Sequence, residues 1–422
     1  MDCHTNAVNG ALSDANTPLI GLAFLTRHAI AGGLFSAEID ALLQRVGNNT
    51  RDASALMDLS TIERLRGNAD NGSALQAAAL AGQKLYSLGD PSRQNGPALL
   101  VFVAPGGFMS NTPIEFLLEH FTTRLQFLFV DQETPIELQL PPHDVAMIGV
   151  AESKENYPIL QTLCHVAMDR RRVINQPERI ARLSRDGAWR LLSGLTGVLY
   201  PENRISSRRE LKDVLANPTR LGELLNGADF PIIIRPVDSH AGENLYKVND
   251  AKELALKLIE MNNDEFCIAP FVDYSDSDGL FRKYRIALVD GRPYAVHMAI
   301  STHWMVHYLN ADMIDNAANR CEEAQFFSTF EDTFAVRHAV ALRGLATASG
   351  LDYMLIDCAE AADGRLLVFE VGTAMIAHSL DCPSLFPYKA QNMKKLFGAF
   401  HDMVCRRAGQ EPSRMESSAN KA

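Results

Sequence analysis

Several patterns that mark well-known chemistries are missing from this chain of 422 residues. Its seven cysteines are scattered and include no Cys-x-x-Cys pair, so the sequence predicts neither a zinc site nor a disulfide framework. It contains no Gly-x-x-x-x-Gly-Lys-Ser/Thr and no Gly-x-Gly-x-x-Gly, so neither a P-loop nor the dinucleotide-binding fingerprint is indicated. No apolar run approaches the ~20 residues needed to cross a bilayer, and the N-terminus lacks the basic and apolar regions of a secretory signal.

The chain also lacks an excess of positive charge. Its 40 Lys and Arg stand against 51 Asp and Glu, which gives a net charge of −11 at pH 7. This balance argues against a nucleic-acid binder and against a protein that binds anionic membranes. The apolar fraction of 47% and the charged fraction of 22% are ordinary for globular proteins. We expect a soluble cytoplasmic protein with two or three domains.

Residues 1–95 are expected to be helical. Two amphipathic stretches, 51–66 and 71–86, are separated by Gly67-Asn68, and together they resemble a single tetratricopeptide-type unit. A solenoid needs about three such repeats. The pattern therefore predicts a tetratricopeptide-like helical cap that docks on the next domain, with partner binding as the alternative.

After this cap, strands and helices alternate. Residues 96–175 contain the apolar runs 98–104, 125–130 and 145–150, separated by helical segments, which is typical of a small doubly wound α/β domain. Residues 176–410 mix helices with strands and hairpins, and residues 411–422 are expected to be a flexible tail.

The strongest chemical signal is a pair of carboxylates in the hairpin 353–371. If Asp363-Gly364 forms a two-residue turn, Asp357 and Glu370 stand directly opposite each other, with Cβ atoms ~5 Å apart. Two like charges among apolar neighbours need neutralisation, and Mg²⁺ favours one or two carboxylates together with phosphate oxygens. The sequence therefore predicts Asp357 and Glu370 as metal ligands. The alternative is a hydrated pair on an exposed sheet edge.

A second signal is the apolar strand 230–236, which ends in Arg235 and leads into the small-residue loop Ser239-His240-Ala241-Gly242. Backbone N–H groups of such a loop can surround phosphates, and the fork of donors on Arg235 can bridge them. Taken alone, the segment is more commonly a plain strand and turn.

A third signal is a group of histidines. His297, His303 and His307 all occupy odd positions, so on one strand they share a face. We expect that strand to line the substrate cleft. Packed or surface histidines are the alternative, and a zinc-protease site is not indicated because Trp304 follows His303.

Read in order, the C-terminal half resembles a known superfamily. The cationic strand with its small-residue loop is followed by an acidic loop after 268–272, then by a hairpin containing Lys283-Tyr284-Arg285, then by the carboxylate hairpin. This order resembles the ATP-grasp superfamily, nearest its carboxylate–amine ligase branch typified by the ribosomal-protein glutamate ligases. The resemblance covers roughly residues 175–410. It implies an α/β (α+β) protein in which an ATP-grasp fold is preceded by a small doubly wound domain.

The resemblance also implies roles for individual residues, with ATP and Mg²⁺ as cofactors. Arg235 and Arg285 are the expected catalytic residues because they hold the phosphates. Arg182 or Arg185 replaces the lysine that touches the α-phosphate. The implied cofactor-binding residues are Arg185, Arg235, Ser239, His240, Gly242, Ala269, Phe271, Val272 and Asp273.

One departure from the family pattern concerns the metal. Gly372 stands where the family's third ligand, an Asn, is usual, so whether one or two Mg²⁺ bind stays open, with Thr373 or water as the substitute. The resemblance implies an ATP-dependent ligase that joins a small-molecule or peptide carboxylate to an amine through an acyl phosphate. A non-catalytic nucleotide-binding scaffold and a small-molecule kinase of the same fold are the alternatives. A homodimer is the default assembly.

Overall fold

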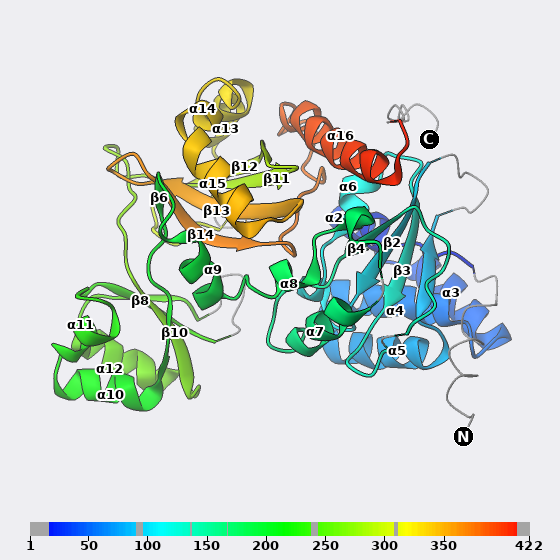
Figure 1. Cartoon of the computed structure of the whole chain (residues 1–422), viewed down its shortest axis with the longest axis horizontal. Helices are drawn as coiled ribbons and strands as arrows, with labels where there is room; N and C mark the ends of the chain where they lie inside the picture. Colours follow the sequence, from blue (N-terminus) through cyan, green and yellow to red (C-terminus); the bar gives the residue numbers. More distant parts are fainter. Residues whose placement is uncertain are drawn as a thin grey trace. The chain divides into compact units, whose positions relative to one another are not determined.

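The computed structural model describes residues 17–89, 96–135, 137–166, 168–237, 244–307 and 311–411. The chain divides into two compact units (Figure 1). Unit 1 comprises Met1–Ala181, Leu351–Tyr353 and Thr373–Ala422, and unit 2 comprises Arg182–Gly350 and Met354–Gly372. The expected mixed α/β class is confirmed, since both units combine sheets with helices. In the described part of the chain no helix is long and apolar enough to span a bilayer.

Unit 1 is built on one sheet of five strands. Its strands are β1 (Leu85–Leu88), β2 (Ala98–Val103), β3 (Arg124–Phe129), β4 (Val145–Ile148) and β5 (Val173–Ile174), in the order β1-β3-β2-β4-β5. All pairs are parallel except β1 with β3. The three apolar runs of the sequence are β2, β3 and β4, as predicted. Every residue of β2 is buried, as expected for a central parallel strand.

Helices flank this sheet. They are α2 (Leu22–Ile30), α3 (Ser36–Asn48), α4 (Ala53–Leu65), α5 (Ala69–Gly82), α6 (Ile114–Leu118), α7 (Tyr157–His165), α8 (Pro177–Ile180) and α16 (Lys389–Ala408). Figure 1 shows α4 and α5 on one side of the sheet and α16 on the other. The N-terminal segment and the α/β segment thus share one unit, which also includes α16.

The helical cap differs from the prediction at its C-terminal end. α4 and α5 pack together as expected, but α5 ends at Gly82 and Tyr86 lies in β1. Tyr86 is buried there and meets the ring of Phe129 edge-on, so tertiary packing decides its conformation. The tetratricopeptide resemblance is not confirmed.

Unit 2 contains an antiparallel sheet of four strands. β7 (Arg204–Ser207), β10 (Glu265–Pro270), β8 (Ile232–Pro236) and β9 (Tyr246–Val248) lie in that order. Buried residues of β8 and β10 pack with α10 (Arg208–Ala216), α11 (Arg220–Leu224) and α12 (Ala251–Glu260) into one hydrophobic core. This packing fixes the strand that carries Arg235.

The second sheet of unit 2 carries the carboxylates. Its strands are β12 (Arg292–Ser301), β11 (Phe281–Val289), β13 (Tyr353–Glu360), β14 (Leu366–Gly372) and β6 (Val198–Leu199), in that order. The helices of this part are α9 (Arg185–Leu192), α13 (Ala317–Thr329), α14 (Phe334–Arg337) and α15 (Ala339–Ser349). The Asp290-Gly291 turn of the first hairpin is confirmed, with φ of 47° and 74° as its two-residue geometry requires.

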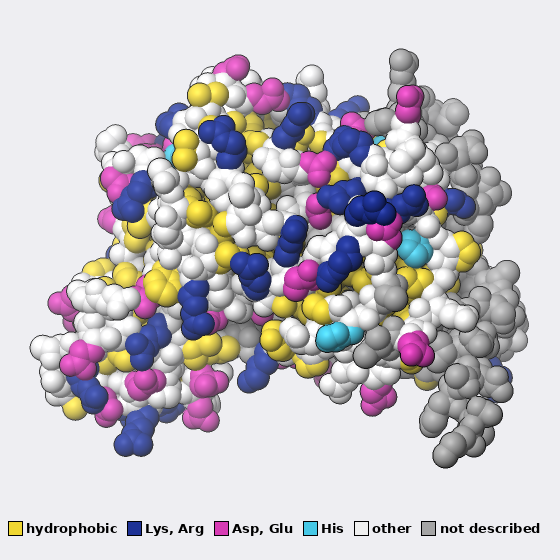
Figure 2. Space-filling model, in the orientation of Figure 1, with side chains coloured by type: hydrophobic (Ala, Val, Ile, Leu, Met, Phe, Trp, Pro, Cys, Tyr) yellow, Lys and Arg dark blue, Asp and Glu magenta, His cyan; other side chains and the backbone are white. Residues whose placement is uncertain are grey.

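Basic side chains are prominent on the surface of unit 1. Figure 2 shows Lys and Arg gathered near the C-terminal end of α16. There Arg407 donates to the carbonyl oxygen of Arg171 at 3.1 Å and forms an ion pair with Asp352. The Arg171 side chain itself is 93% exposed, so this part of the surface is solvated.

Candidate functional site

The two carboxylates of the second sheet lie directly opposite each other. Asp357 on β13 pairs with Glu370 on β14. The turn that connects these strands is longer than predicted: Ala361 N–H donates to the Arg365 carbonyl oxygen at 2.9 Å, which leaves three loop residues. The last of them, Gly364, has φ of 83°, as such a loop requires.

A bulge corrects the register that this longer loop would otherwise give. Cys358 pairs with Val368, but the register shifts by one residue between Asp357 and Cys358, so that Asp357 meets Glu370. Phe369 is the extra residue of the bulged strand. The predicted pairing is confirmed, although the predicted two-residue turn is wrong.

Asp357 is buried between two cations of β11. Its Oδ1 accepts from Arg285 Nε at 2.7 Å, and its Oδ2 accepts from Arg285 Nη2 at 3.0 Å. Lys283 Nζ lies 2.7 Å from Oδ2. Burial by itself would raise the pKa of Asp357, but the charges of Arg285 and Lys283 outweigh it and hold the pKa well below its usual range. Asp357 is therefore ionised and fully paired.

Glu370 belongs to a second group of charges, which joins three parts of unit 2. Its Oε1 lies 3.9 Å from Arg185 Nη2, at the first turn of α9. Arg235 on β8 is influenced by both Arg185 and Glu370. Burial and the charge of Arg185 lower the pKa of Arg235 to about 10, and the charge of Glu370 acts to raise it. The Glu370 side chain is 46% exposed, so ligands can reach it.

Together the two groups make a cationic site. Among the described residues, four cations (Arg185, Arg235, Lys283 and Arg285) lie beside two carboxylates, so the cations outnumber the anions there. Such an arrangement suits an anionic ligand with several oxygens, because guanidinium groups bind phosphate and carboxylate through paired donors.

The carboxylates fit a metal ion only in part. Among the described residues, no group of three or more His, Cys, Asp or Glu side chains is placed to hold a metal. Both oxygens of Asp357 already accept from Arg285 or Lys283, so a metal would have to displace a cation. Of these two carboxylates, Glu370 is the one that is open to solvent. The metal-ligand assignment stays a prediction.

The histidines do not share one strand. β12 ends at Ser301, so only His297 lies on it, opposite Arg285. His303 lies beyond the strand, where its Nδ1 accepts from Met305 N–H at 3.2 Å. His307 lies near the cations, and burial together with the charges of Lys283 and Arg285 lowers its pKa. The single-strand prediction is wrong because the chain turns after Ser301.

The predicted cofactor-binding residues Ala269, Phe271, Val272 and Asp273 lie at the end of β10 and in the segment that follows it. Ala269 is within the β10–β8 ladder, and Phe271 N–H donates to the Pro231 carbonyl oxygen at 3.0 Å. Asp273 accepts from Ser275 N–H at 2.9 Å and Ser275 Oγ at 2.8 Å, and these hydrogen bonds lower its pKa. The Asp273 carboxylate thus stabilises its own turn.

Two aromatic rings and a lysine meet at this segment. Lys247 Nζ on β9 lies 3.8 Å from the centre of the Phe271 ring, and Trp304 meets the same ring edge-on with centroids 5.8 Å apart. Lys247 was missed by sequence reasoning, because a three-residue strand offers too short a pattern. Ser239, His240 and Gly242 lie outside the described residues.

Comparison with known proteins gives structural similarities at low sequence identity. No protein-family model matches the chain, and no curated protein matches it. The crystal structure of the VanG D-Ala:D-Ser ligase from Enterococcus faecalis covers 74% of this chain and 100% of its own, with a TM-score of 0.45 and 13% identity. A RimK-domain ATP-grasp protein from Sphaerobacter thermophilus covers 72% and 99%, with a TM-score of 0.42 and 14% identity. The D-alanine–D-alanine ligase from Coxiella burnetii covers 74% and 96%, with a TM-score of 0.43 and 11% identity.

Proposed function

We propose that unit 2 binds ATP and that the protein is an ATP-dependent carboxylate–amine ligase of the ATP-grasp type. The observation that carries this proposal is the group of four cations around the opposed Asp357 and Glu370. The cations come from α9, β8 and β11, so one polyphosphate could be held from several sides. A site of this kind works by positioning and by stabilising charge.

In the proposed reaction, a substrate carboxylate attacks the γ-phosphorus of ATP and releases ADP. An amine then attacks the carbonyl carbon of the acyl phosphate, and inorganic phosphate leaves as the amide forms. Arg185 and Arg235 hold the phosphates, while Arg285, oriented by Asp357, offers positive charge where the transferred group passes. ATP enters the site as its magnesium complex.

The aromatic segment gives the proposed nucleotide a place for its base. Phe271 and Trp304 offer apolar surface, and Lys247 adds a cation beside it. In this proposal, the base packs near Phe271 and the phosphates extend toward Arg235. His297 and His307 lie near the Arg285 group, which suits contact with the acceptor.

Thermal unfolding with Mg²⁺-ATP tests nucleotide binding. Ligand at about 100 times its Kd adds about 2.7 kcal/mol of stability. We expect a clear upward shift for the wild type. The shift should be much reduced in Arg235→Met, because a cation that would hold the phosphates is lost, and in Glu370→Gln, because the exposed carboxylate predicted to bind the Mg²⁺ of the Mg²⁺-ATP complex is lost. Arg365→Met is the matched control, since Arg365 pairs with Asp363 in the turn of the same hairpin. The absence of any wild-type shift at millimolar nucleotide would contradict the proposal.

A non-catalytic nucleotide sensor is the second candidate. The neutralised Asp357 and the presence of Gly372 at the third ligand position favour it. ADP release separates the candidates: a ligase releases ADP only with an acid and an amine present and forms an amide. A kinase leaves a stable phosphorylated product. Stabilisation by ATP without ADP release with any acid–amine pair identifies a sensor.

A further inference from the structure

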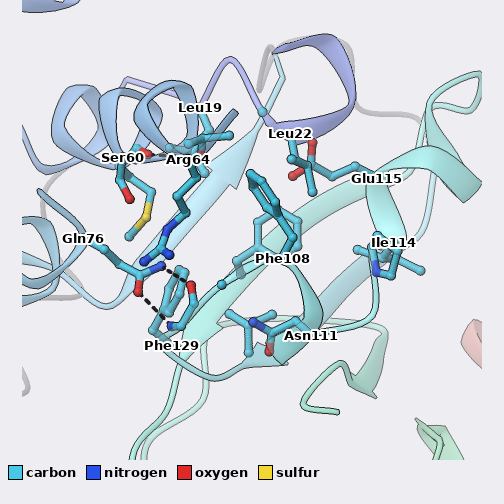
Figure 3. A pocket seen from close by; sticks show the side chains of 18 of the residues that line it. Leu19, Leu22, Ser60, Arg64, Gln76, Phe108, Asn111, Ile114, Glu115 and Phe129 are labelled. Atoms are coloured by element: carbon cyan, nitrogen blue, oxygen red, sulfur yellow. Dashed lines mark hydrogen bonds between the residues drawn. The ribbon is translucent and has the colours of Figure 1, made fainter. Parts of the chain in front are cut away.

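Unit 1 has a pocket of its own, which the proposed function does not use. It lies between α4 and α5 and the carboxyl end of β2, and has a volume of about 130 Å³ (Figure 3). Parallel β3 and β4 flank β2 on opposite sides. In open α/β sheets, a crevice forms at such a point beyond the carboxyl ends of the strands, and ligands bind there.

The floor of the pocket is a two-glycine loop held in place by side chains. Gly106 N–H donates to Gln76 Oε1 at 2.8 Å, and Gln76 Nε2 donates to the Gly106 carbonyl oxygen at 3.2 Å, as the dashed lines in Figure 3 mark. Asn111 makes the same pair of bonds with Ala104, at 2.7 and 2.8 Å. Because the loop is fixed before any ligand arrives, binding would cost little ordering entropy.

Arg64 is the unmatched charge of the pocket. Its side chain reaches from α4 into the pocket on the side of Gln76 and Phe129 (Figure 3). The buried Nε has no hydrogen-bond partner, and Nη2 donates to Ser73 Oγ at 3.1 Å. No carboxylate of the described residues lies within 4.0 Å of the guanidinium. Burial of a donor without a partner is costly, so the guanidinium is prepared for an acceptor.

The two carboxylates that line the pocket are already engaged. Asp58 accepts from the N–H groups of Ile20 at 2.9 Å and Gly21 at 3.3 Å, and Glu115 accepts from Ala23 N–H at 3.0 Å. Both therefore fix the start of α2. Neither carboxylate accepts from Arg64, so its guanidinium can donate to a ligand.

Most of the remaining lining is apolar, although Ser60, Thr61 and Thr112 also line the pocket. Leu22, Met57, Phe108, Ile114, Phe127 and Phe129 line the pocket. An engineered apolar cavity of about 150 Å³ holds benzene, so this pocket suits a body of about that size. A dianion that is fully hydrated in solution would have oxygens without hydrogen-bond partners against these walls. A monocarboxylate instead presents one charged end and one apolar end.

We propose that this pocket of unit 1 binds a small monocarboxylate, with its carboxylate on Arg64 and its apolar body against Phe108, Phe129 and Met57. The site belongs to unit 1 alone and does not depend on the proposed function of unit 2. Two oxygens of one carboxylate match the paired donors of a guanidinium. The ligand would thus supply the acceptor that Nε lacks.

Isothermal titration of the full chain with isovalerate tests the site, since this branched acid has the required size and charge. We expect binding with a Kd of about 1 mM or below. Isovaleramide has the same shape without the charge, and should bind at least about tenfold more weakly. Arg64→Met should weaken isovalerate binding at least about tenfold, since a charge-assisted hydrogen bond is lost.

Arg66→Met is the matched control, because Arg66 lies two residues away, is exposed and pairs with Glu63. It should bind isovalerate as the wild type does. Unfolding midpoints of both variants check that Arg64→Met still folds. Equal binding of acid and amide, equal binding by Arg64→Met, or the absence of isovalerate binding would each overturn the proposal. Tighter binding of inorganic phosphate than of isovalerate would overturn the carboxylate assignment.

Discussion

Asp357 shows how one buried residue couples stability to the charge of a site. Asp357→Asn leaves Lys283 and Arg285 facing each other without their shared anion, and removing one partner of a buried ion pair costs about 3–5 kcal/mol. We expect urea unfolding at pH 7 to show a loss of this order. Adding Lys283→Met to Asp357→Asn should recover part of the loss, because one unpaired cation is then removed. A double variant no more stable than Asp357→Asn would contradict this account.

The same residue sets a pH dependence. Because the folded-state pKa of Asp357 lies below its ordinary value, ionised Asp357 stabilises the fold above about pH 4, and that stability is lost as the pH falls further. As the pH falls from 5 to about 3, the free energy of unfolding should therefore decrease more for the wild type than for Asp357→Asn. Parallel acid profiles of the two proteins would show that the ion pair contributes nothing.

Glu115 should give stability the opposite pH dependence, with the fold less stable at higher pH. Burial raises its pKa from 4.5 to about 7, with smaller opposing effects of the Ala23 and Leu22 N–H groups and reinforcing effects of Asp58 and Glu119. A raised carboxyl pKa favours the protonated folded form. Stability from this group is present below pH 4.5 and is lost as the pH rises through 7, by an amount of about 3 kcal/mol.

Glu115→Gln tests this expectation. The amide oxygen can still accept from Ala23 N–H, but it does not titrate. The free energy of unfolding should fall for the wild type between pH 5 and 8, and should fall less for Glu115→Gln. Asp58 retains part of the dependence, because burial raises its pKa to about 6. An unchanged slope in the variant would exclude Glu115 as the source.

At the scale of elements, the loop of the carboxylate hairpin depends on one glycine. Gly364 has φ of 83°, and a Cβ added there would meet nothing within 4 Å, so the cost of substitution is backbone strain alone. Gly364→Ala should lower stability by about 1–2 kcal/mol. Gly194→Ala is the control, because a Cβ at Gly194 also meets nothing within 4 Å and its φ is not positive. Equal unfolding midpoints for the two variants would contradict the expected strain.

The elements also show what local patterns reveal. The buried run of β2 and the Asp290-Gly291 turn follow from short-range signals, and the structure has them where the sequence predicts them. The Asp357–Glu370 pairing was predicted from a turn one residue too short, and a bulge that no local pattern reveals restored it. Strand β1 was missed because the helix predicted for 71–86 was extended through Leu85 and Tyr86, which pair with β3 instead.

For the whole molecule, the sequence indicated charged groups but not their partners. Lys283 and Asp357 are far apart in the chain, and only the pairing of β11 with β13 brings them together. The sequence did not predict a binding role for Arg64, since one arginine on an amphipathic helix is ordinary. Such a role is suggested only by the strand end and the glycine loop that line the same pocket of unit 1.

The two proposals assign different ligands to different units, which hydrogen exchange can separate. Mg²⁺-ATP should slow exchange in the peptides of unit 2 that contain β8, β11 and β14, because bound ligand suppresses local opening. Isovalerate should slow exchange in α4 and in the loop around Gly106, and should leave those peptides of unit 2 unchanged. Arg235→Met should abolish only the first pattern, and Arg64→Met only the second. Protection of the same peptides by both ligands would mean that they share one site, and would refute the assignment of a separate acid pocket to unit 1.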